Sequence, residues 1–357
     1  MVDRRKFLIN AGIIGGGLAI GGIGTLAFNQ YSNYRFRDDG SRICGTNLVT
    51  WRKEGFFEIN KILEKLMGLT NHVSLVTSYS MRSNYSRRIR EGSETPSLQS
   101  LEYAIRQIKS LGCMDIMLKP HVNVEDGTRT LIYPGEDFYN MYFKEFIYPL
   151  AEFAEKNSVE QLCIGTELML AATISPGVFE KGINGIRKRF GGKLTFAAYD
   201  STASFIDFWG MLDFIGYNHY NPVNPDNPTL NDMEKDFAPT ISWLENLAKK
   251  YSKKILFTEY GCTSLDGGAK MPPTKTRRYM RNKRVDFNEQ NNYIKGFYNS
   301  YWEKSWCLGG DLWCAYNPEE IEEESRNLDY YWLGKPVQAT IEERYFNDAN
   351  QNLHFTE

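Results

Sequence analysis

Eight short apolar runs alternate with longer amphipathic segments between residues 43 and 345, and this alternation limits the possible folds more than any other feature. Apolar runs of this length are typical of parallel strands, which are buried on both faces. The expected strands are Ile43–Val49, His72–Thr77, Met114–Lys119, Gln161–Gly165, Leu194–Ala198, Phe214–Tyr217, Ile255–Thr258 and Gly309–Trp313.

The longer segments between these strands predict helices. Between residues 138 and 156, for example, Phe143, Phe146 and Leu150 share one helical face, and charged residues lie opposite them. Pro149 lies within this segment, so we expect a kink there. The expected helices are Phe57–Met67, Leu98–Leu111, Phe138–Lys156, Val178–Arg189, Met233–Tyr251, Asn288–Lys304 and Val337–Tyr345.

Strands alternating with helices predict an α/β fold, a single (β/α)8 TIM barrel that forms one domain over residues 43–350. An open, doubly wound sheet is the alternative architecture. That sheet normally carries a glycine-rich phosphate-binding loop after its first strand. Residues 44–47, Cys-Gly-Thr-Asn, do not form such a loop, and no repeat or low-complexity linker divides the domain.

The first 30 residues form a separate segment ahead of the barrel. Residues 3–6, Asp-Arg-Arg-Lys, precede a run rich in Gly, Ile, Leu and Ala that extends to about residue 28. Paired arginines before an apolar run are typical of a twin-arginine export signal, whereas so many glycines disfavour a buried helix. No clear cleavage site follows, and the run is long enough to span a bilayer. Residues 1–30 are therefore expected to be a signal or a membrane anchor, with residues 31–42 as a linker.

This segment predicts that the domain works outside the cytoplasm, whether periplasmic, secreted or anchored to a membrane and facing outward. The twin-arginine export machinery is then an expected partner. A net charge of −2 provides no overall field that would attract nucleic acid. We expect a monomer.

The aromatic and cysteine content indicates which kinds of binding site the chain could hold. Aromatic residues form 14% of the chain, which suits a surface that stacks on sugar faces, although a large core also uses aromatics. The cysteines lack metal-binding spacing; in an exported protein they could form disulfides, and small buried thiols within strands are an equal alternative. They are Cys44, Cys113, Cys163, Cys262, Cys307 and Cys314. Nothing in the sequence indicates a zinc site.

Two of the expected strands lead into glutamates, Glu167 and Glu259. A (β/α)8 barrel places its active site at the carboxyl ends of its strands. A carboxylate at the end of a buried strand costs free energy unless it is hydrogen-bonded or used. Either glutamate alone could be a salt-bridged strand end. Two together are the minimum set for cleaving a glycosidic bond, because one can protonate the leaving oxygen while the other attacks the sugar carbon.

Other strand ends supply hydrogen-bonding and stacking groups, which suit the hydroxyl edges and C–H faces of sugars. The candidate substrate-binding residues are Trp51, His121, Tyr217, Asn218, Tyr220 and Trp313. His121, Tyr217 and Trp313 could instead be core residues. Asp200 is expected to cap the helical turn that follows it. A basic insertion, residues 267–284, follows the seventh strand without an assigned role.

In these motifs the sequence resembles clan A of the glycoside hydrolases, and most closely family 113, the β-mannanase family. The resemblance is carried by Ile-Gly-Thr-Glu-Leu at 164–168, Asp-Phe-Ile-Gly-Tyr at 213–217, Phe-Thr-Glu-Tyr-Gly at 257–261, Asp-Gly-Gly-Ala at 266–269, Val-Asp-Phe-Asn-Glu-Gln at 285–290 and Gly-Gly-Asp-Leu-Trp at 309–313. In that clan the acid/base glutamate ends strand four and the nucleophile ends strand seven. The resemblance therefore implies Glu167 as acid/base and Glu259 as nucleophile of a retaining mechanism.

The resemblance implies an endo-β-1,4-mannanase-like hydrolase that acts on a polysaccharide or oligosaccharide and requires no metal or organic cofactor. A nearby aromatic hydroxyl, best assigned to Tyr217, is expected to hydrogen-bond Glu259. Many clan members carry asparagine before the acid/base, where it contacts the 2-hydroxyl of the sugar. Thr166 stands there in this chain, so the group that recognises that hydroxyl is not predicted.

Three other functions stay open. The first is a β-glycosidase of different sugar specificity, and the second is a carbohydrate-binding barrel without catalysis. The third is a metal-dependent hydrolase that uses His121, His219, Asp200 and a glutamate. Such metal sites usually draw on closely spaced ligands, which this sequence lacks.

Overall fold

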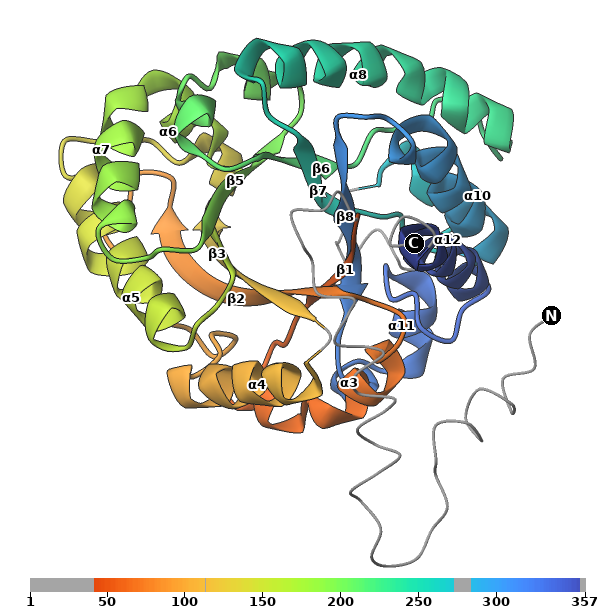
Figure 1. The fold of residues 1–357 in the computed structure, drawn as a ribbon, viewed down its shortest axis with the longest axis horizontal. Helices are drawn as coiled ribbons and strands as arrows, with labels where there is room; N and C mark the ends of the chain where they lie inside the picture. Colours follow the sequence, from red (N-terminus) through yellow and green to blue (C-terminus); the bar gives the residue numbers. More distant parts are fainter. Residues whose placement is uncertain (1–41, 113, 273–283, 354–357) are drawn as a thin grey trace, which may run out of the picture.

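Eight parallel strands close into a barrel in the computed structural model, which describes residues 42–112, 114–272 and 284–353 (Figure 1). Each strand pairs with the next in sequence, and β8 pairs with β1. The strands are β1 (Ile43–Leu48), β2 (His72–Ser83), β3 (Asp115–Asp126), β4 (Gln161–Thr166), β5 (Lys193–Tyr199), β6 (Ile215–His219), β7 (Ile255–Tyr260) and β8 (Cys307–Ala315). The predicted (β/α)8 TIM barrel is confirmed.

Helices cover the outside of the barrel. The α-helices are α3 (Asn60–Leu66), α4 (Leu98–Leu111), α5 (Tyr148–Lys156), α6 (Met169–Ile174), α7 (Pro176–Arg187), α8 (Leu230–Tyr251), α10 (Phe287–Phe297), α11 (Glu323–Leu328) and α12 (Val337–Leu353). Short 3-10 turns are Gly55–Glu58, Arg129–Leu131, Ser201–Phe205, Phe208–Met211, Gly268–Lys270 and Pro318–Glu320. Of these elements, the sequence predicted the turn after Asp200, and it did not predict α6, α11 or the other turns as separate elements.

Two expected helices contain a π-helical stretch. The segment expected as Phe138–Lys156 begins as the π-helix Tyr139–Ile147 and continues as α5. Pro149 lies in the first turn of α5, where its missing N–H is tolerated, so it coincides with the change of helix type. Similarly, α10 continues into a π-helix over Tyr298–Trp302.

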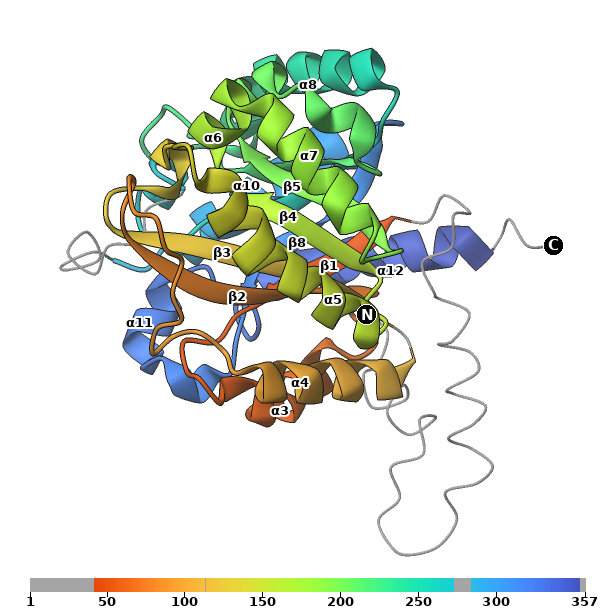
Figure 2. The same cartoon turned by 90° about the vertical axis from the view of Figure 1, so that its left-hand side faces the viewer.

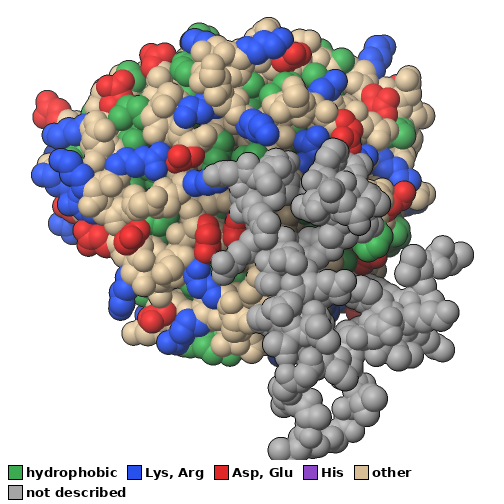
Figure 3. Space-filling model, viewed as in Figure 1, with side chains coloured by type: hydrophobic (Ala, Val, Ile, Leu, Met, Phe, Trp, Pro, Cys, Tyr) green, Lys and Arg blue, Asp and Glu red, His purple; other side chains and the backbone are tan. Residues whose placement is uncertain are grey.

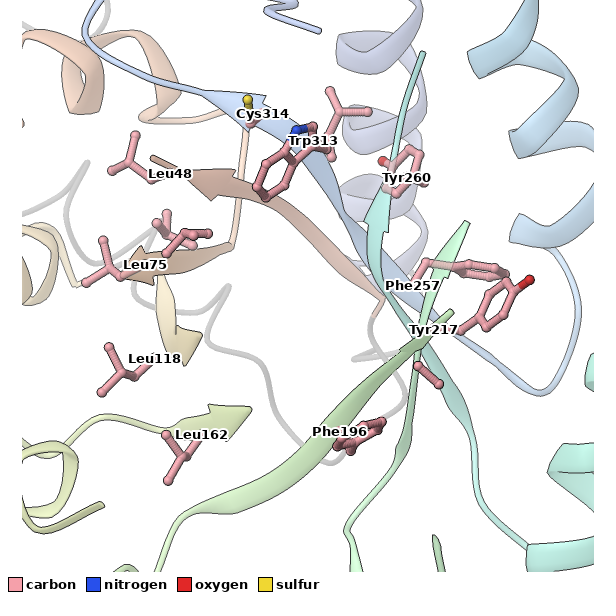
Figure 4. Close-up of a cluster of buried hydrophobic side chains, with 14 of the residues drawn as sticks. Leu48, Leu75, Leu118, Leu162, Phe196, Tyr217, Phe257, Tyr260, Trp313 and Cys314 are labelled. Atoms are coloured by element: carbon pink, nitrogen blue, oxygen red, sulfur yellow. The ribbon is translucent and has the colours of Figure 1, made fainter. Parts of the chain in front are cut away.

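The core has two parts because side chains alternate across each strand. The larger part lies between the strands and the helices, and Figure 4 shows Leu48, Leu75, Leu118 and Leu162 projecting from four successive strands toward the outer layer. The smaller part fills the barrel interior with Ile43, Met117, Cys163, Ala197, Phe214 and Leu256. The interior is thus packed rather than open.

Strands β2 and β3 are 12 residues long and continue beyond the other strands (Figure 2). Their pairing runs from His72 with Asp115 to Ser83 with Asp126, so they form a two-stranded wall above the barrel mouth. The sequence predicted shorter strands that ended at Thr77 and Lys119. Pro120 follows directly, and proline is rare inside central strands. Beyond this point burial alternates along β2 and falls away along β3 after Val122.

The last helix, α12, packs on the outside of the barrel beside α10, near the amino end of β1 (Figure 1). The Tyr345 hydroxyl donates to the Gly45 carbonyl at 2.9 Å, and the Trp302 indole donates to Asp348 at 2.5 Å. Arg42, the first described residue, donates to the Cys307 carbonyl at 2.9 Å. The amino end of β1 and the last helix therefore pack together at this end.

Other sequence expectations have varied outcomes. Five cysteines, all but Cys113, are described, and each is a buried free thiol. The predicted export segment and nearly all of the linker lie outside the described residues, as does Cys113. No helix in the described ranges is long and apolar enough to cross a membrane. Basic and acidic side chains are interspersed on the face in Figure 3.

Candidate active site

Glu259 lies near the end of β7, where it is buried and surrounded by donors. Lys119 donates to its Oε1 at 2.7 Å, and the hydroxyl of Tyr220 donates to its Oε2 at 2.7 Å. Nε2 of His121 lies 3.4 Å from Oε1. A buried carboxylate is costly without such partners. The hydrogen bonds from Lys119 and Tyr220 hold Glu259 as an anion in a fixed orientation.

Lys119 was not among the predicted site residues, although it occupies the centre of the barrel. It is fully buried on β3, and besides Glu259 its ammonium donates to Oδ1 of Asn47 at 3.1 Å and to the Thr258 carbonyl at 2.7 Å. An ammonium group has three donors, and all three are used. The available signal was spacing, because Lys119 and His121 are two apart and face the same side of the strand.

Tyr220, rather than Tyr217, provides the hydroxyl that bonds Glu259. The assignment to Tyr217 is wrong because side chains alternate along β6. Asn218 points into the barrel, so Tyr217 points outward, where it packs edge-on against Trp243 of α8 with ring centroids 5.4 Å apart. Figure 4 shows Tyr217 beside Phe257 in the apolar layer.

The pKa of Tyr220 is raised well above its usual value by burial and by the neighbouring carboxylate of Glu259. Its hydroxyl therefore keeps its proton and remains a donor at working pH.

Glu167 follows β4 in a left-handed backbone conformation, with φ of 58°. Its N–H donates to the Ala197 carbonyl at 2.8 Å, which holds this turn against β5. Oε1 accepts from Nδ2 of Asn218 at 3.0 Å, and Oε2 lies 3.9 Å from Nε of Arg129. The Glu167 side chain is 19% exposed, against 5% for Glu259. One carboxylate is therefore enclosed by donors, and the other remains open to solvent.

Asn218 brings the two glutamates into one site. It pairs in register with Glu259 across β6 and β7, and its side chain donates to Glu167. Its Oδ1 accepts from the hydroxyl of Thr258 at 2.7 Å, which fixes the amide orientation. Two glutamates that are 92 positions apart in the sequence numbering thus share one short chain of contacts.

His121 stacks on Trp313 with parallel rings, 5.6 Å between centroids and 3° between planes. Both residues are buried inside the mouth, and Nζ of Lys119 lies 5.7 Å from the centre of the Trp313 ring. Burial, followed by the charge of Arg129, lowers the pKa of His121 to about 3, although Glu259 acts in the opposite direction. His121 is therefore neutral at working pH.

Arg129 is a further site residue that the sequence did not indicate. It comes from the turn after β3 and reaches back to His121, with 2.8 Å between Nη1 and Nδ1, and to Oδ1 of Asn123, 2.6 Å from Nη2. It was missed because β3 was expected to end at Lys119. Only the longer strand turns this arginine back over the mouth.

The remaining predicted residues have separate places. Trp51 lies at the rim after β1, edge-on to Tyr316 with ring centroids 4.9 Å apart. Asp200 accepts from the N–H of Thr202 at 2.7 Å, which confirms the expected cap. The hydroxyl of Thr166 donates to the Pro120 carbonyl at 3.4 Å, so it is directed at β3.

The ligand set considered for a metal-dependent hydrolase is not assembled. His219 points outward from β6 into a ring of aromatic side chains that includes Phe237, Phe297 and Tyr301, whereas His121 points into the barrel. Among the residues that the structure describes, no three His, Cys, Asp or Glu side chains are grouped as metal ligands. That set of residues is therefore not a metal site.

The sequence matches the model of Glycoside Hydrolase Family 113 over residues 49–335. The chain belongs to glycoside hydrolase family 113. By membership of this family it is a glycoside hydrolase, and the predicted clan A resemblance is confirmed. A search of curated protein sequences found no significant match.

Solved structures agree with this family 113 fold. A structure titled as a complex of a GH113 beta-1,4-mannanase has 24% identity and a TM-score of 0.72, covering 86% of this chain and 99% of its own. The GH113 beta-mannanase AaManA from Alicyclobacillus acidocaldarius has 22% identity and a TM-score of 0.73, covering 87% and 99%. A beta-glucuronidase from an uncultured Clostridium sp. has 12% identity and a TM-score of 0.56, covering 86% of this chain and 50% of its own.

Proposed function

We propose that this family 113 chain is a retaining endo-β-1,4-mannanase, with Glu259 as the nucleophile and Glu167 as the general acid/base. The observation that carries the proposal is the difference between the two carboxylates. Glu259 is enclosed by the donors of Lys119 and Tyr220, as a fixed anion should be, whereas Glu167 is partly exposed beside Asn218. The similar structures titled as family 113 β-mannanases, at 22–25% identity, support the choice of substrate.

In the first step, a carboxylate oxygen of Glu259 attacks the anomeric carbon while the bond from that carbon to the glycosidic oxygen breaks. Glu167 gives its proton to the leaving oxygen, and a glycosyl ester forms on Glu259. Lys119 and Tyr220 orient the attacking carboxylate, and the flat stack of Trp313 on His121 provides a surface beneath the sugar.

In the second step, water attacks the same carbon and the ester bond breaks, which regenerates the Glu259 anion. Glu167, now a carboxylate, accepts the proton of the attacking water. Its exposure suits this exchange with solvent. Two inversions at one carbon leave the configuration unchanged.

The direct test is to incubate the purified protein with mannan, glucan, xylan and galactan, and to follow product chain length and anomeric configuration by NMR. We expect internal cleavage of mannan, with the β-anomer appearing before mutarotation. Early α-anomer would contradict the retaining assignment. Cleavage of only another polysaccharide would contradict the mannanase assignment and leave the mechanism standing.

The two glutamates are expected to fail differently. Glu259→Ala removes the nucleophile, so it should be almost inactive on every substrate. Glu167→Ala should retain activity on an aryl glycoside with an activated leaving group, which departs without a proton, and azide should accelerate it. Glu145→Ala, an exposed glutamate in the outer helical layer, is the matched control and should behave as wild type. Azide rescue of Glu259→Ala that gives a glycosyl azide of retained configuration would instead exchange the roles, because retention requires that the nucleophile is still present.

A further inference from the structure

A single guanidinium group connects three residues of the site. Arg129 contacts Nδ1 of His121 and Oδ1 of Asn123, and its Nε lies 3.9 Å from Glu167. His121 and Asn123 are two apart on β3, so both face the same side of the wall that β3 forms with β2. The arginine side chain is 18% exposed, which leaves it partly shielded from water.

This contact determines where the proton of His121 lies. A guanidinium group has only donors, so Nδ1 of His121 must accept, and the single proton of the neutral ring must sit on Nε2. The lowered pKa of His121, which arises from burial and then from the charge of Arg129, keeps the ring neutral. Its planar stack on Trp313 also prevents rotation, so the direction of the Nε2–H bond is fixed.

That Nε2–H group is a buried donor without a hydrogen-bond acceptor among the described residues. It lies 3.4 Å from Oε1 of Glu259, the oxygen that Lys119 already bonds. A buried donor in this position costs free energy unless a ligand satisfies it. The free protein therefore holds a neutral N–H donor next to the carboxylate of Glu259, and both groups point toward the same region of the site.

We propose that Arg129 is a positioning residue that holds His121 in its Nε2–H tautomer, and that this N–H donates to the 2-hydroxyl of the sugar attacked by Glu259. The inference rests on the proposed function. The 2-hydroxyl is on the carbon next to the one under attack, so a donor within 3.4 Å of the attacking carboxylate is in reach of it. Thr166 does not provide this contact because its hydroxyl is bonded to the Pro120 carbonyl.

The consequence for substrate choice is a requirement for a free hydroxyl at carbon 2. The N–H group is buried and has no acceptor among the described residues, so a hydroxyl oxygen at this carbon would satisfy it. Sugars that lack oxygen at this carbon leave the donor unsatisfied, which should cost about 10- to 100-fold in kcat/KM.

The test is a cycle of two changes, one in the protein and one in the substrate. The substrates are the 2,4-dinitrophenyl β-mannobioside and its analogue lacking the 2-hydroxyl on the ring that is cleaved. Wild type should lose about 10- to 100-fold in kcat/KM on the analogue, and His121→Phe, which keeps the flat ring over Trp313, should lose less than about threefold. Equal losses in both proteins would overturn the inference.

A second measurement does not depend on turnover. The sequence contains four histidines, so selective 15N labelling of histidine gives a simple NMR spectrum. His121 in wild type should show the shifts of the Nε2–H tautomer, and Arg129→Met should shift it toward a mixture while reducing discrimination at carbon 2. Arg129→Lys should restore part of both effects, because an ammonium group also donates only. An unchanged tautomer in Arg129→Met would overturn the role of the arginine.

These results are separable from those that test the proposed function. Failure to cleave mannan would reject the mannanase assignment, and the same cycle would then use the disaccharide glycoside that the enzyme does cleave. The tautomer of His121 is measured without substrate, so its outcome is independent of both.

Discussion

Tyr217 and Tyr220 lie three positions apart, and their side chains point to opposite sides of the barrel wall. The hydroxyl of Tyr220 donates to Glu259, whereas the ring of Tyr217 packs against Trp243.

 Side chains alternate along β6 and the residue that follows it, so the ring of Tyr220 points into the site and that of Tyr217 points toward the helices. A substitution of each hydroxyl therefore separates a role at Glu259 from a role in packing.

We expect Tyr220→Phe to reduce kcat by about 10- to 100-fold, since a hydrogen bond to a charged group is worth about 1.5–3 kcal/mol. Tyr217→Phe is the matched control and should keep kcat, because its ring still packs against Trp243. The measurement is steady-state kinetics on mannan, with thermal unfolding to show that both variants fold. A larger loss of kcat in Tyr217→Phe would return the catalytic hydrogen bond to that residue.

At this scale the sequence predicted the strand-end glutamates from two motifs, and the structure brings Glu167 and Glu259 together through Asn218. It did not predict Lys119 or Arg129. Lys119 looked like an ordinary charge at the end of a strand, because its burial depends on contacts with β1 and β7 that no local pattern encodes. Arg129 depends on the true length of β3.

At the level of secondary-structure elements, the barrel closes where β8 pairs with β1, and the two backbones approach closely at Gly309 and Ile43. Gly309 has φ of 104°, and a Cβ added there would lie 2.1 Å from the Ile43 carbonyl oxygen and 2.6 Å from its nitrogen. Only glycine allows the two strands to pair at this distance. The last strand is therefore fixed to the first at its amino end.

Gly309→Ala should reduce the free energy of unfolding by about 3 kcal/mol or more, because it combines a strained backbone with a clash against main-chain atoms. Gly334→Ala separates the two causes: its φ is 81° but a Cβ there meets nothing within 4 Å, so it should cost about 1 kcal/mol. Gly135→Ala meets neither condition and should be close to wild type.

Urea unfolding followed by circular dichroism measures all three variants. Equal losses in the Gly309 and Gly334 variants would show that backbone strain, and not the approach of β8 to β1, sets the cost.

Helices and strands were predictable where the period was regular. Leu98–Leu111 agrees residue for residue with α4, which is capped by Ser97 and ended by Gly112. The ends of β2 and β3 were not predictable, since their extension is stabilised by pairing between the two strands outside the barrel. The π-helical stretches have no signal in the period of apolar residues.

For the molecule as a whole, acid stability depends on two histidines that fold in neutral form. Burial lowers the pKa of His219 to about 3, and burial with the Arg129 charge lowers that of His121 to about 3. In the unfolded chain a histidine has a pKa of about 6.5. Between these values the unfolded state binds more protons, so stability is fully present above about pH 6.5 and is lost as the pH falls toward 3.

His219→Phe should remove the share of this acid sensitivity that His219 contributes. Neither of its ring nitrogens has a hydrogen-bond partner among the described residues, and its neighbours are aromatic, so phenylalanine suits the position. The variant should gain about 2 kcal/mol relative to wild type on going from pH 7.5 to pH 5, measured by urea unfolding at both values. An identical pH dependence in the two proteins would contradict this assignment.

The two ends of the described chain lie on the same side of the barrel. Arg42 and the amino end of β1 pack beside α12, and Figure 2 shows α12 at the opposite end from the extended strands β2 and β3. The glutamates are at the carboxyl ends of the strands, on the far side. A protein fixed to a bead or a surface at Arg42 or at α12 would therefore turn its two glutamates toward the surrounding liquid, and a large substrate could approach without meeting the point of attachment.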